Sequence, residues 1–288
     1  MLEYKSAIFI PGANEKMLSK AATLDADLVI FDLEDSVSEN QKQTARELVV
    51  KVIEQSRARQ KPYGVRLNSL DSAHLSDDLH AIVPVKPELI VLPKVESGDD
   101  LEQIDALIGD IENKSNIEIG ATKLIILTAE TPGSLFRFDS LSNISNRLLG
   151  MTWGAEDLAS DLGAAHGRDK LGEWLPPFQL AQTLCLAKAR DLGVQPIDTV
   201  MADFNDLEGL RKECLAAKEI GFTGKLAIHP CQLDIINHVF MPTEQEIEFA
   251  RRVIELFSSN TQAGALQLDG VMLDVPHLRA AQRLLRRL

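Results

Sequence analysis

The chain has 288 residues, of which 45% are hydrophobic and 25% charged, the ordinary balance of a globular protein with a substantial core. Its 30 Lys and Arg against 43 Asp and Glu give a formal net charge of −13, which argues against a nucleic-acid or anionic-membrane surface. An anionic ligand would therefore need basic groups placed locally.

The segment Met1–Lys5 leads directly into an apolar run, without the basic, apolar and cleavage regions of a signal peptide. No apolar run approaches the roughly 20 residues that cross a bilayer. The three cysteines, Cys185, Cys214 and Cys231, are far apart and lack metal-type spacing. We therefore expect a soluble, cytoplasmic protein with reduced thiols and no membrane partner.

Apolar runs that end in polar or turn residues alternate with helical patterns along most of the chain. Eight such runs are predicted as strands: 6–11, 28–33, 63–67, 88–93, 124–129, 148–154, 197–202 and 225–229. Amphipathic helices are predicted between most of them: 15–24, 41–59, 73–83, 99–112, 177–192 and 206–220. This alternation predicts an α/β protein, a (β/α)8 TIM barrel over residues 1–240.

Residues 241–288 exceed what a barrel needs. They predict a helix over 244–257, a polar loop over 258–264, a turn at Asp269-Gly270 and a basic helix over 276–288. We expect this extension to form a lid or an arm that reaches a neighbouring subunit.

Charged side chains are expected at the carboxyl ends of the predicted strands, where a barrel collects its chemistry. Glu130 and Asp157 each follow a buried run, on neighbouring strands. Two carboxylates at one rim can hold Mg2+ and leave its other positions to water and substrate. An alternative is that each acid caps the helix that follows its strand.

Arg66 ends the third strand in Val-Arg-Leu-Asn68, and its planar guanidinium suits bidentate binding of a substrate carboxylate. A purely structural ion pair with Glu34 or Asp35 is the alternative. Glu34 and Asp35 would then orient Arg66 or hold metal-bound waters. Lys94 has two possible partners, Glu96 or the substrate, and the pattern does not choose between them.

Eight ordered motifs carry a resemblance to a known family. They are Phe9-Ile-Pro-Gly12, Ala26-Asp-Leu-Val-Ile-Phe-Asp-Leu-Glu34-Asp35-Ser-Val, Val65-Arg66-Leu-Asn68, Leu92-Pro-Lys94-Val-Glu96, Glu130-Thr-Pro-Gly, Gly154-Ala-Glu-Asp157-Leu, Gly221-Phe-Thr-Gly-Lys-Leu-Ala-Ile-His229-Pro-Cys-Gln and Asp269-Gly-Val-Met-Leu-Asp274-Val-Pro. Over nearly its whole length the chain resembles the citrate lyase β-subunit-like proteins of the HpcH/HpaI aldolase and citrate lyase family.

The resemblance implies a TIM barrel, assembled as a homotrimer or hexamer, that acts on a 3-hydroxyacyl thioester of CoA or of an acyl carrier. A citryl-, malyl- or citramalyl-thioester would yield an acetyl-thioester and a 2-oxo acid. By the same resemblance, Glu130 and Asp157 bind Mg2+ and, through it, the substrate, while Arg66 holds the carboxylate of the 2-oxo acid. Asp274 is expected to act as acid or base in a neighbouring subunit.

Further assignments follow from the resemblance. Asn68 is expected at the substrate, Glu34 and Asp35 among the catalytic groups, and Lys5, Asn14 and Lys16 at the CoA moiety. Lys5 stands where relatives often carry Arg, so it keeps the charge without the fork. Two alternatives stay open, an HpcH-type class II pyruvate aldolase acting on free hydroxy-keto acids and a catalytically idle binding or assembly subunit.

Overall fold

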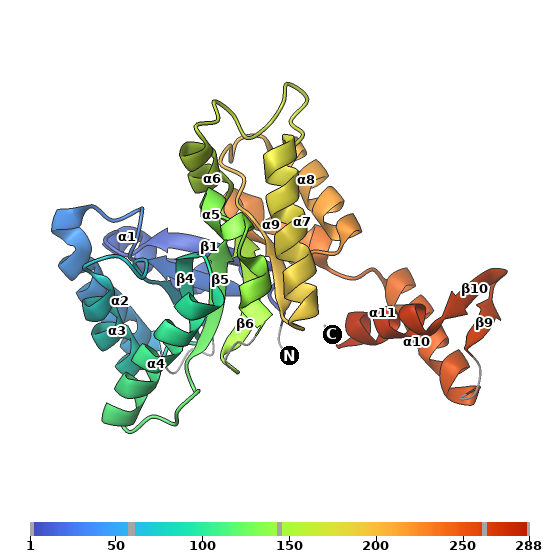
Figure 1. Ribbon diagram of the computed structural model, residues 1–288, viewed down its shortest axis with the longest axis horizontal. Coiled ribbons are helices and arrows are strands. Elements are labelled where there is room, and N and C mark those ends of the chain that lie inside the picture. Colours follow the sequence, from blue (N-terminus) through green and yellow to red (C-terminus); the bar gives the residue numbers. More distant parts are fainter. Residues whose placement is uncertain (1–2, 57–60, 143–145, 261–263, 287–288) are drawn as a thin grey trace.

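The computed structural model describes residues 3–56, 61–142, 146–260 and 264–286. The predicted barrel is confirmed, because eight parallel strands close in sequence order (Figure 1). Their bounds are β1 (Ser6–Pro11), β2 (Leu28–Asp32), β3 (Tyr63–Arg66), β4 (Leu89–Val95), β5 (Lys123–Thr128), β6 (Leu148–Trp153), β7 (Gln195–Asp198) and β8 (Gly224–Ala227). β1 closes the barrel by pairing with β8, from Ser6 opposite Lys225 to Ile8 opposite Ala227.

Helices follow the strands and cover the outside of the barrel (Figure 1). The α-helices of this part are α1 (Glu15–Leu18), α2 (Lys42–Ser56), α3 (Leu75–Ile82), α4 (Gly98–Lys114), α5 (Pro132–Leu135), α6 (Ala155–Leu162), α7 (Pro176–Asp191), α8 (Leu207–Ile220) and α9 (Leu233–Phe240). Short 3-10 helices span Ala21–Thr23, Glu39–Gln41, Val83–Val85, Phe138–Ser142 and Pro230–Gln232.

The helix expected over 15–24 divides into α1 and a 3-10 turn. α5, α6 and α9 were not predicted; each has eight residues or fewer, so its periodic pattern extends over little more than two turns. The end of the helix predicted over 41–59 lies outside the described residues from 57 onward, as do 261–263 of the predicted loop and 287–288 of the last helix.

Alternation along the strands divides the core into two parts. Inward-facing side chains fill the barrel, among them Ile30, Val91, Ile125, Leu127 and Leu226. The residues between them in the strands pack against the surrounding helices in a second, larger cluster. The barrel is thus a filled scaffold, and chemistry is confined to its rim.

The C-terminal extension forms a small unit of its own, made of α10 (Glu244–Ser259), the hairpin β9 (Ala265–Leu268) and β10 (Val271–Asp274), and α11 (Val275–Leu285). The predicted turn at Asp269-Gly270 joins the hairpin, and both residues have positive φ, 50° and 83°, as a two-residue hairpin turn requires. Val253, Phe257 and Leu273 centre a separate apolar cluster in this unit. Figure 1 shows it projecting away from the barrel.

Within the described part of the chain, no helix combines the length and apolarity needed to cross a membrane. All three cysteines are free, Cys185 and Cys214 buried and Cys231 exposed. Burial raises the pKa of both buried thiols.

Candidate active site

A cavity of about 390 Å³ opens at the carboxyl ends of the barrel strands. Seven of the eight strands, each with its own residues or with the loop that follows it, contribute to the wall, and β4 does not. The lining residues are Phe9, Pro11, Asp32, Asp35, Ser36, Arg66, Leu127, Glu130, Trp153, Gly154, Ala155, Glu156, Asp157, Thr199, Val200, Leu226 and Ile228. Arg66, Asp35, Glu130 and Asp157 are thereby brought together, as the sequence predicts.

Glu130 is buried at the base of the cavity, with 2% of its surface exposed. The residue before it, Ala129, has a φ of 56°, a strained conformation for a side chain with a Cβ. The Oε2 atom of Glu130 accepts a hydrogen bond of 2.5 Å from the backbone N–H of Lys94, whose φ is also positive at 54°. Burial, with the nearby charges of Glu34 and Asp157, raises the pKa of Glu130 to about 8.

Gly154 leaves the space that the Glu130 side chain occupies. A Cβ at Gly154 would lie 2.4 Å from Glu130 Cγ and 2.7 Å from Oε1, both impossible contacts. Gly154 is also the N-cap residue of α6, so Asp157 lies in the first turn of that helix and faces the same cavity. The helix α5 is capped by Thr131. Neither acid is therefore an N-cap, and the capping alternative is wrong for both.

The two carboxylates fit a hard cation. Glu130 and Asp157 line one cavity, and the pKa of Glu130 rises because the positive charges around it do not compensate for its burial. Among the residues that the structure describes, no group of three or more His, Cys, Asp or Glu could enclose a metal ion. Such a two-carboxylate site suits Mg2+, which keeps several waters or substrate oxygens, and does not suit a closed zinc site.

Arg66 forms the opposite side of the charged cluster. Its Nε and Nη2 atoms bind both carboxylate oxygens of Asp32, at 2.7 and 2.8 Å, and its guanidinium carbon lies 4.7 Å from the ring centre of Phe9. These contacts fix the guanidinium plane. The third nitrogen, Nη1, forms an ion pair with Glu34 Oε2 at 3.0 Å. Arg66 thus makes the structural ion pair considered as an alternative, yet it also lines the cavity.

Glu34 lies behind the cavity between two cations. It contacts Arg66 and, through Oε1, the ammonium of Lys94 at 3.1 Å. Burial raises its pKa to about 7, although both cations oppose that shift. Glu34 is thus the partner of Lys94, and Glu96 instead pairs with Arg137 and Thr131. Asp35 is about half exposed at the rim, 3.5 Å from Arg66.

Two residues predicted to contact substrate or CoA do not line the cavity. Asn68 is 3% exposed and does not line the cavity, and its amide is used by Lys42, Leu33 and Asp78. Lys5 precedes β1, so it lies at the amino end of the strand, opposite the cavity, where it pairs with Asp27 at 2.9 Å. A residue at a strand start cannot reach the carboxyl rim of the same barrel.

Asn14 and Lys16 lie in and after the loop that follows β1. Asn14 caps α1 by accepting a hydrogen bond from the Met17 N–H, and it lines a second recess with Pro11 and Ser36, which also line the main cavity. Lys16 is exposed on α1. Their contact with CoA stays a prediction.

Asp274 lies on the extension, at the N-cap position of α11. Its carboxylate is 2.6 Å from His277 Nδ1, and this hydrogen bond lowers its pKa below the ordinary value. It does not line the cavity of its own chain. Its role in a neighbouring subunit stays a prediction.

Sequence reasoning missed Asp32, Phe9 and Trp153, which line the cavity. Asp32 is the last residue of β2 and the direct partner of Arg66, so an acid at a strand end beside two other acids was an available signal. The two aromatic residues look like core positions of their strands and give no such signal.

Comparisons with known proteins agree with this geometry. A family model described as HpcH/HpaI aldolase/citrate lyase matches residues 5–230, and a second, described as C-C bond lyase of the TIM-barrel fold, matches residues 180–288. The chain belongs to the HpcH/HpaI aldolase/citrate lyase family.

The similarity to individual relatives extends over nearly the whole chain. The citrate lyase subunit beta of Haemophilus influenzae is 33% identical, covering 98% of this chain and 96% of the relative. A (3S)-malyl-CoA thioesterase of Cereibacter sphaeroides is 36% identical, with 98% and 93% covered. The structure of CitE from Mycobacterium tuberculosis with magnesium, acetoacetate and coenzyme A has a TM-score of 0.76 and 29% identity, with 98% and 97% covered.

Proposed function

We propose that the protein is a Mg2+-dependent carbon–carbon lyase that cleaves a 3-hydroxyacyl thioester of the citryl, malyl or citramalyl type. The observation that carries the proposal is one cavity in which Glu130 and Asp157 stand together with an oriented Arg66 guanidinium. The names of the relatives support it, since they include citrate lyase and a structure that holds magnesium, an oxo acid and coenzyme A.

In the cleavage direction the substrate hydroxyl loses its proton and becomes the ketone of the 2-oxo acid. The carbon–carbon bond breaks, its electron pair passes to the α-carbon of the thioester, and that carbon takes up one proton. Mg2+ held by Glu130 and Asp157 would supply positive charge for the oxygen that becomes the ketone.

The chain's own residues perform the remaining tasks. Arg66 binds the carboxylate of the oxo acid, and Asp32 and Glu34 keep its guanidinium plane fixed. The apolar walls of Phe9, Leu127 and Trp153 limit access of water. The carboxyl group of Asp274, carried on the arm of a neighbouring subunit, would protonate the α-carbon.

This proposal includes assembly and location. Supply of Asp274 by another copy requires an oligomer, and we propose a homotrimer or hexamer. The free state of all three cysteines supports a reducing, cytoplasmic location.

Hydrolysis of the thioester is a second candidate, favoured by the (3S)-malyl-CoA thioesterase relatives. The two reactions differ in products: a lyase releases an acetyl-thioester and a 2-oxo acid, whereas a thioesterase releases free CoA and the intact hydroxy acid.

The test is turnover of citryl-, malyl- and citramalyl-CoA by the purified protein, with Mg2+ or with EDTA, and with both product pairs measured. We expect release of acetyl-CoA from at least one thioester, abolished by EDTA and restored by Mg2+. If free CoA is the sole CoA-containing product, the protein is a thioesterase and the lyase proposal is rejected. Turnover of free hydroxy-keto acids alone would indicate the pyruvate aldolase.

A further inference from the structure

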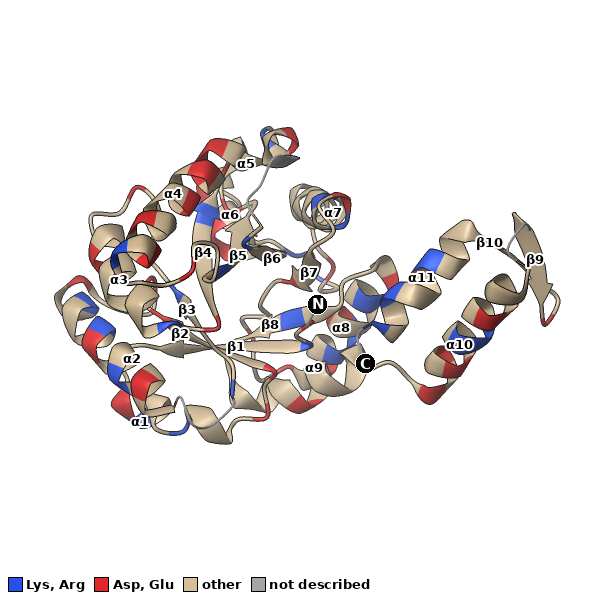
Figure 2. Cartoon of the chain, turned by 90° about the horizontal axis from the view of Figure 1, so that it is seen from below, with Lys and Arg blue, Asp and Glu red and all other residues tan. Residues whose placement is uncertain are grey.

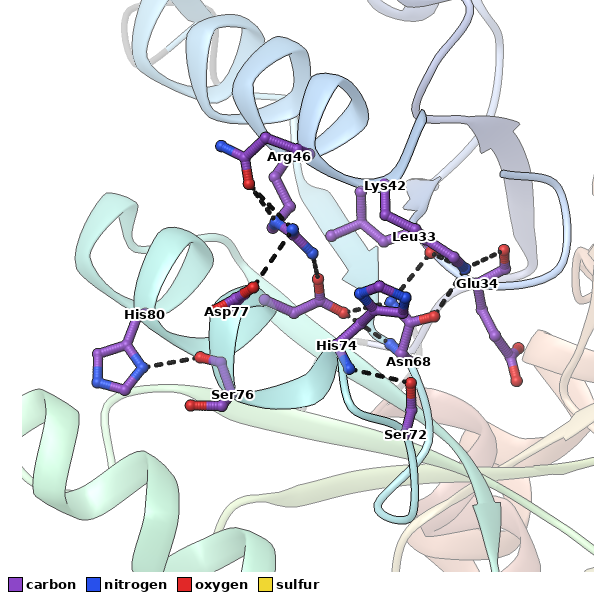
Figure 3. A network of polar contacts seen from close by, with 12 residues as sticks. Leu33, Glu34, Lys42, Arg46, Asn68, Ser72, His74, Ser76, Asp77 and His80 are labelled. Atoms are coloured by element: carbon purple, nitrogen blue, oxygen red, sulfur yellow. Dashed lines mark hydrogen bonds and ion pairs between the residues drawn. The ribbon is translucent and has the colours of Figure 1, made fainter. Parts of the chain in front are cut away.

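A network of buried polar groups lies between α2, α3 and the turn after β2 (Figure 3). Its members are Lys42, Arg46, Asn68 and Asp78, and none of them lines the cavity. All four are buried, with Asp78 fully enclosed. The proposed mechanism gives none of them a task.

Lys42 uses every hydrogen that its ammonium group can donate. Its Nζ atom lies 2.8 Å from the carbonyl oxygen of Leu33, 2.8 Å from that of Glu34 and 2.7 Å from Asn68 Oδ1. An ammonium group has three donors, so this set is complete. Two of the three acceptors belong to the backbone of the turn that carries Glu34.

The remaining groups fix the orientation of the third acceptor. Asn68 donates through Nδ2 to Asp78 at 2.6 Å and to Leu33 O at 3.1 Å, so its Oδ1 must face Lys42. Asp78 in turn pairs with Arg46 at 3.0 Å. The network therefore has one satisfied arrangement of donors and acceptors.

Lys42 carries its charge among neutral oxygens. Within the described residues its ammonium forms no ion pair with a carboxylate, and its residue is only 6% exposed. Such burial costs stability that an apolar side chain would not, so a role in specifying geometry is the better explanation.

The side chain of Glu34 points away from Lys42 (Figure 3). Its carboxylate contacts Arg66 Nη1 at 3.0 Å and Lys94 Nζ at 3.1 Å. The Glu34 N–H is bound to Asp32 Oδ1 at 2.9 Å. Lys42 therefore fixes the carbonyl side of this turn, and Asp32 fixes the amide side.

We infer that Lys42 is a positioning residue for the oxo-acid subsite: it holds the backbone of Glu34 so that the Glu34 carboxylate keeps Arg66 and Lys94 in place. The inference rests on the proposed function, because Arg66 is taken to bind the carboxylate of the 2-oxo acid. Lys42 acts on that ligand only through Glu34.

The test compares Lys42→Met, which keeps the length of the side chain without its donors, with Lys51→Met, an exposed lysine on the same helix. With Mg2+ present, the Kd for oxaloacetate or pyruvate should rise about tenfold or more in Lys42→Met, while the Kd for Mg2+ stays within about twofold of wild type. Lys51→Met should bind both as wild type does. Unchanged oxo-acid affinity in Lys42→Met would overturn the inference.

A double variant separates positioning from a general loss of stability. In a Glu34→Gln background, Lys42→Met should weaken oxo-acid binding by less than about twofold, because its route of action is already removed. If Lys42→Met reduces oxo-acid affinity in the Glu34→Gln background as much as it does in wild type, Lys42 acts by a route that does not pass through Glu34. If Lys42→Met does not fold, Lys42→Gln, which retains amide donors, should give an intermediate loss, and wild-type affinity would count against us.

A measurement that needs no substrate separates the test of Lys42 from the test of lyase activity. The amide hydrogens of residues 34–37 should exchange about tenfold faster in Lys42→Met than in wild type, and at the wild-type rate in Lys51→Met. If the wild-type protein turns over no thioester, the proposed function is rejected, but the exchange measurement still tests the role of Lys42. If the enzyme is active and the exchange rates are unchanged in Lys42→Met, the inference about Lys42 is rejected and the proposed function stands.

Discussion

At the scale of single residues, the position of Glu130 is set by the backbone conformation of two neighbours and by the absence of a side chain at a third. Ala129 and Lys94 both adopt positive φ, and the Lys94 N–H thereby reaches the Glu130 carboxylate. Gly154 supplies the space beside it. Backbone conformation and a missing Cβ, rather than a side-chain partner, therefore set the geometry of this acid.

We predict that Gly154→Ala lowers kcat/KM for the thioester by about two orders of magnitude, because the new methyl group would displace Glu130 by a sizeable fraction of an ångström or more. Gly109→Ala is the control, since a Cβ there meets only ordinary contacts at 3.7 Å and replaces a helical glycine. Steady-state kinetics and thermal unfolding of both variants check this. Wild-type activity of Gly154→Ala would show that Glu130 tolerates displacement.

At the scale of elements, the amino end of the barrel has an ionic cluster that joins α4 to β6. Arg147, just before β6, binds both carboxylate oxygens of Glu112 on α4, at 2.7 and 2.8 Å, and also pairs with Asp105. Figure 2 shows charged residues distributed over the outer helices, but the Arg147–Glu112 pair is buried. This cluster lies at the opposite end from the cavity and has a structural role.

We predict that Glu112→Gln lowers the free energy of unfolding at pH 7 by about 3 kcal/mol, since it removes the fully buried anion of Arg147 and leaves the more exposed Asp105 as its carboxylate partner. Burial acts to raise the pKa of Glu112, but hydrogen bonds from Arg147 and from the amides of Thr122 and Gly120 outweigh it and lower the pKa to about 2. The stabilisation is therefore complete above the ordinary pKa of 4.5 and is lost as pH falls toward 2.

Urea unfolding between pH 7 and pH 2.5 measures this prediction. The difference between wild type and Glu112→Gln should narrow as the pH falls below 4.5, whereas Glu102→Gln, on the exposed face of α4, should match wild type throughout. A constant difference at every pH would contradict the assigned pKa.

Much of the element pattern was readable from the sequence. The eight strands follow from apolar runs that stop at turn residues, Glu130 and Asp157 follow from their positions after those runs, and Arg66 follows from its position at the end of one. The position of Asn68 outside the cavity could not be predicted, because a polar residue after a strand can turn inward to a buried network as readily as outward to a ligand. Lys42 gave no signal, since a helical lysine is normally solvated.

At the scale of the whole molecule, the barrel and the C-terminal extension (the arm, α10 to α11) each have a hydrophobic core of their own. The arm has its own core around Val253 and Leu273, and Figure 1 shows it extending away from the barrel that precedes it. Val271, Met272 and Val275, next to Asp274, leave apolar surface exposed. This exposed apolar surface supports the proposal that a neighbouring copy packs against the extension.

We predict that Asp274→Asn retains Mg2+ and oxo-acid binding but loses about two orders of magnitude or more in turnover, the usual scale for a lost acid or base. Calorimetric titration and steady-state kinetics on the same preparation check both halves. Loss of Mg2+ binding would assign Asp274 to the metal site instead.

Mixed oligomers of Asp274→Asn and Arg66→Ala should recover part of the activity, because one chain supplies an intact barrel and the other an intact arm. A mixture of Arg66→Ala with Glu130→Gln should recover none, since every barrel then carries a defect. Absence of recovery in the first mixture would exclude sharing of Asp274 between subunits.

The exposure of Cys231 offers a practical way to test whether the extension of a neighbouring subunit approaches the cavity, as proposed. Cys185 and Cys214 are buried, so a maleimide dye would react with one thiol of the unmodified sequence. Cys231 follows β8 three residues after Ile228, which lines the cavity. A fluorophore attached there would stand beside the entrance, and a change in its emission on assembly would support the proposed approach of a neighbouring extension, without any engineered cysteine.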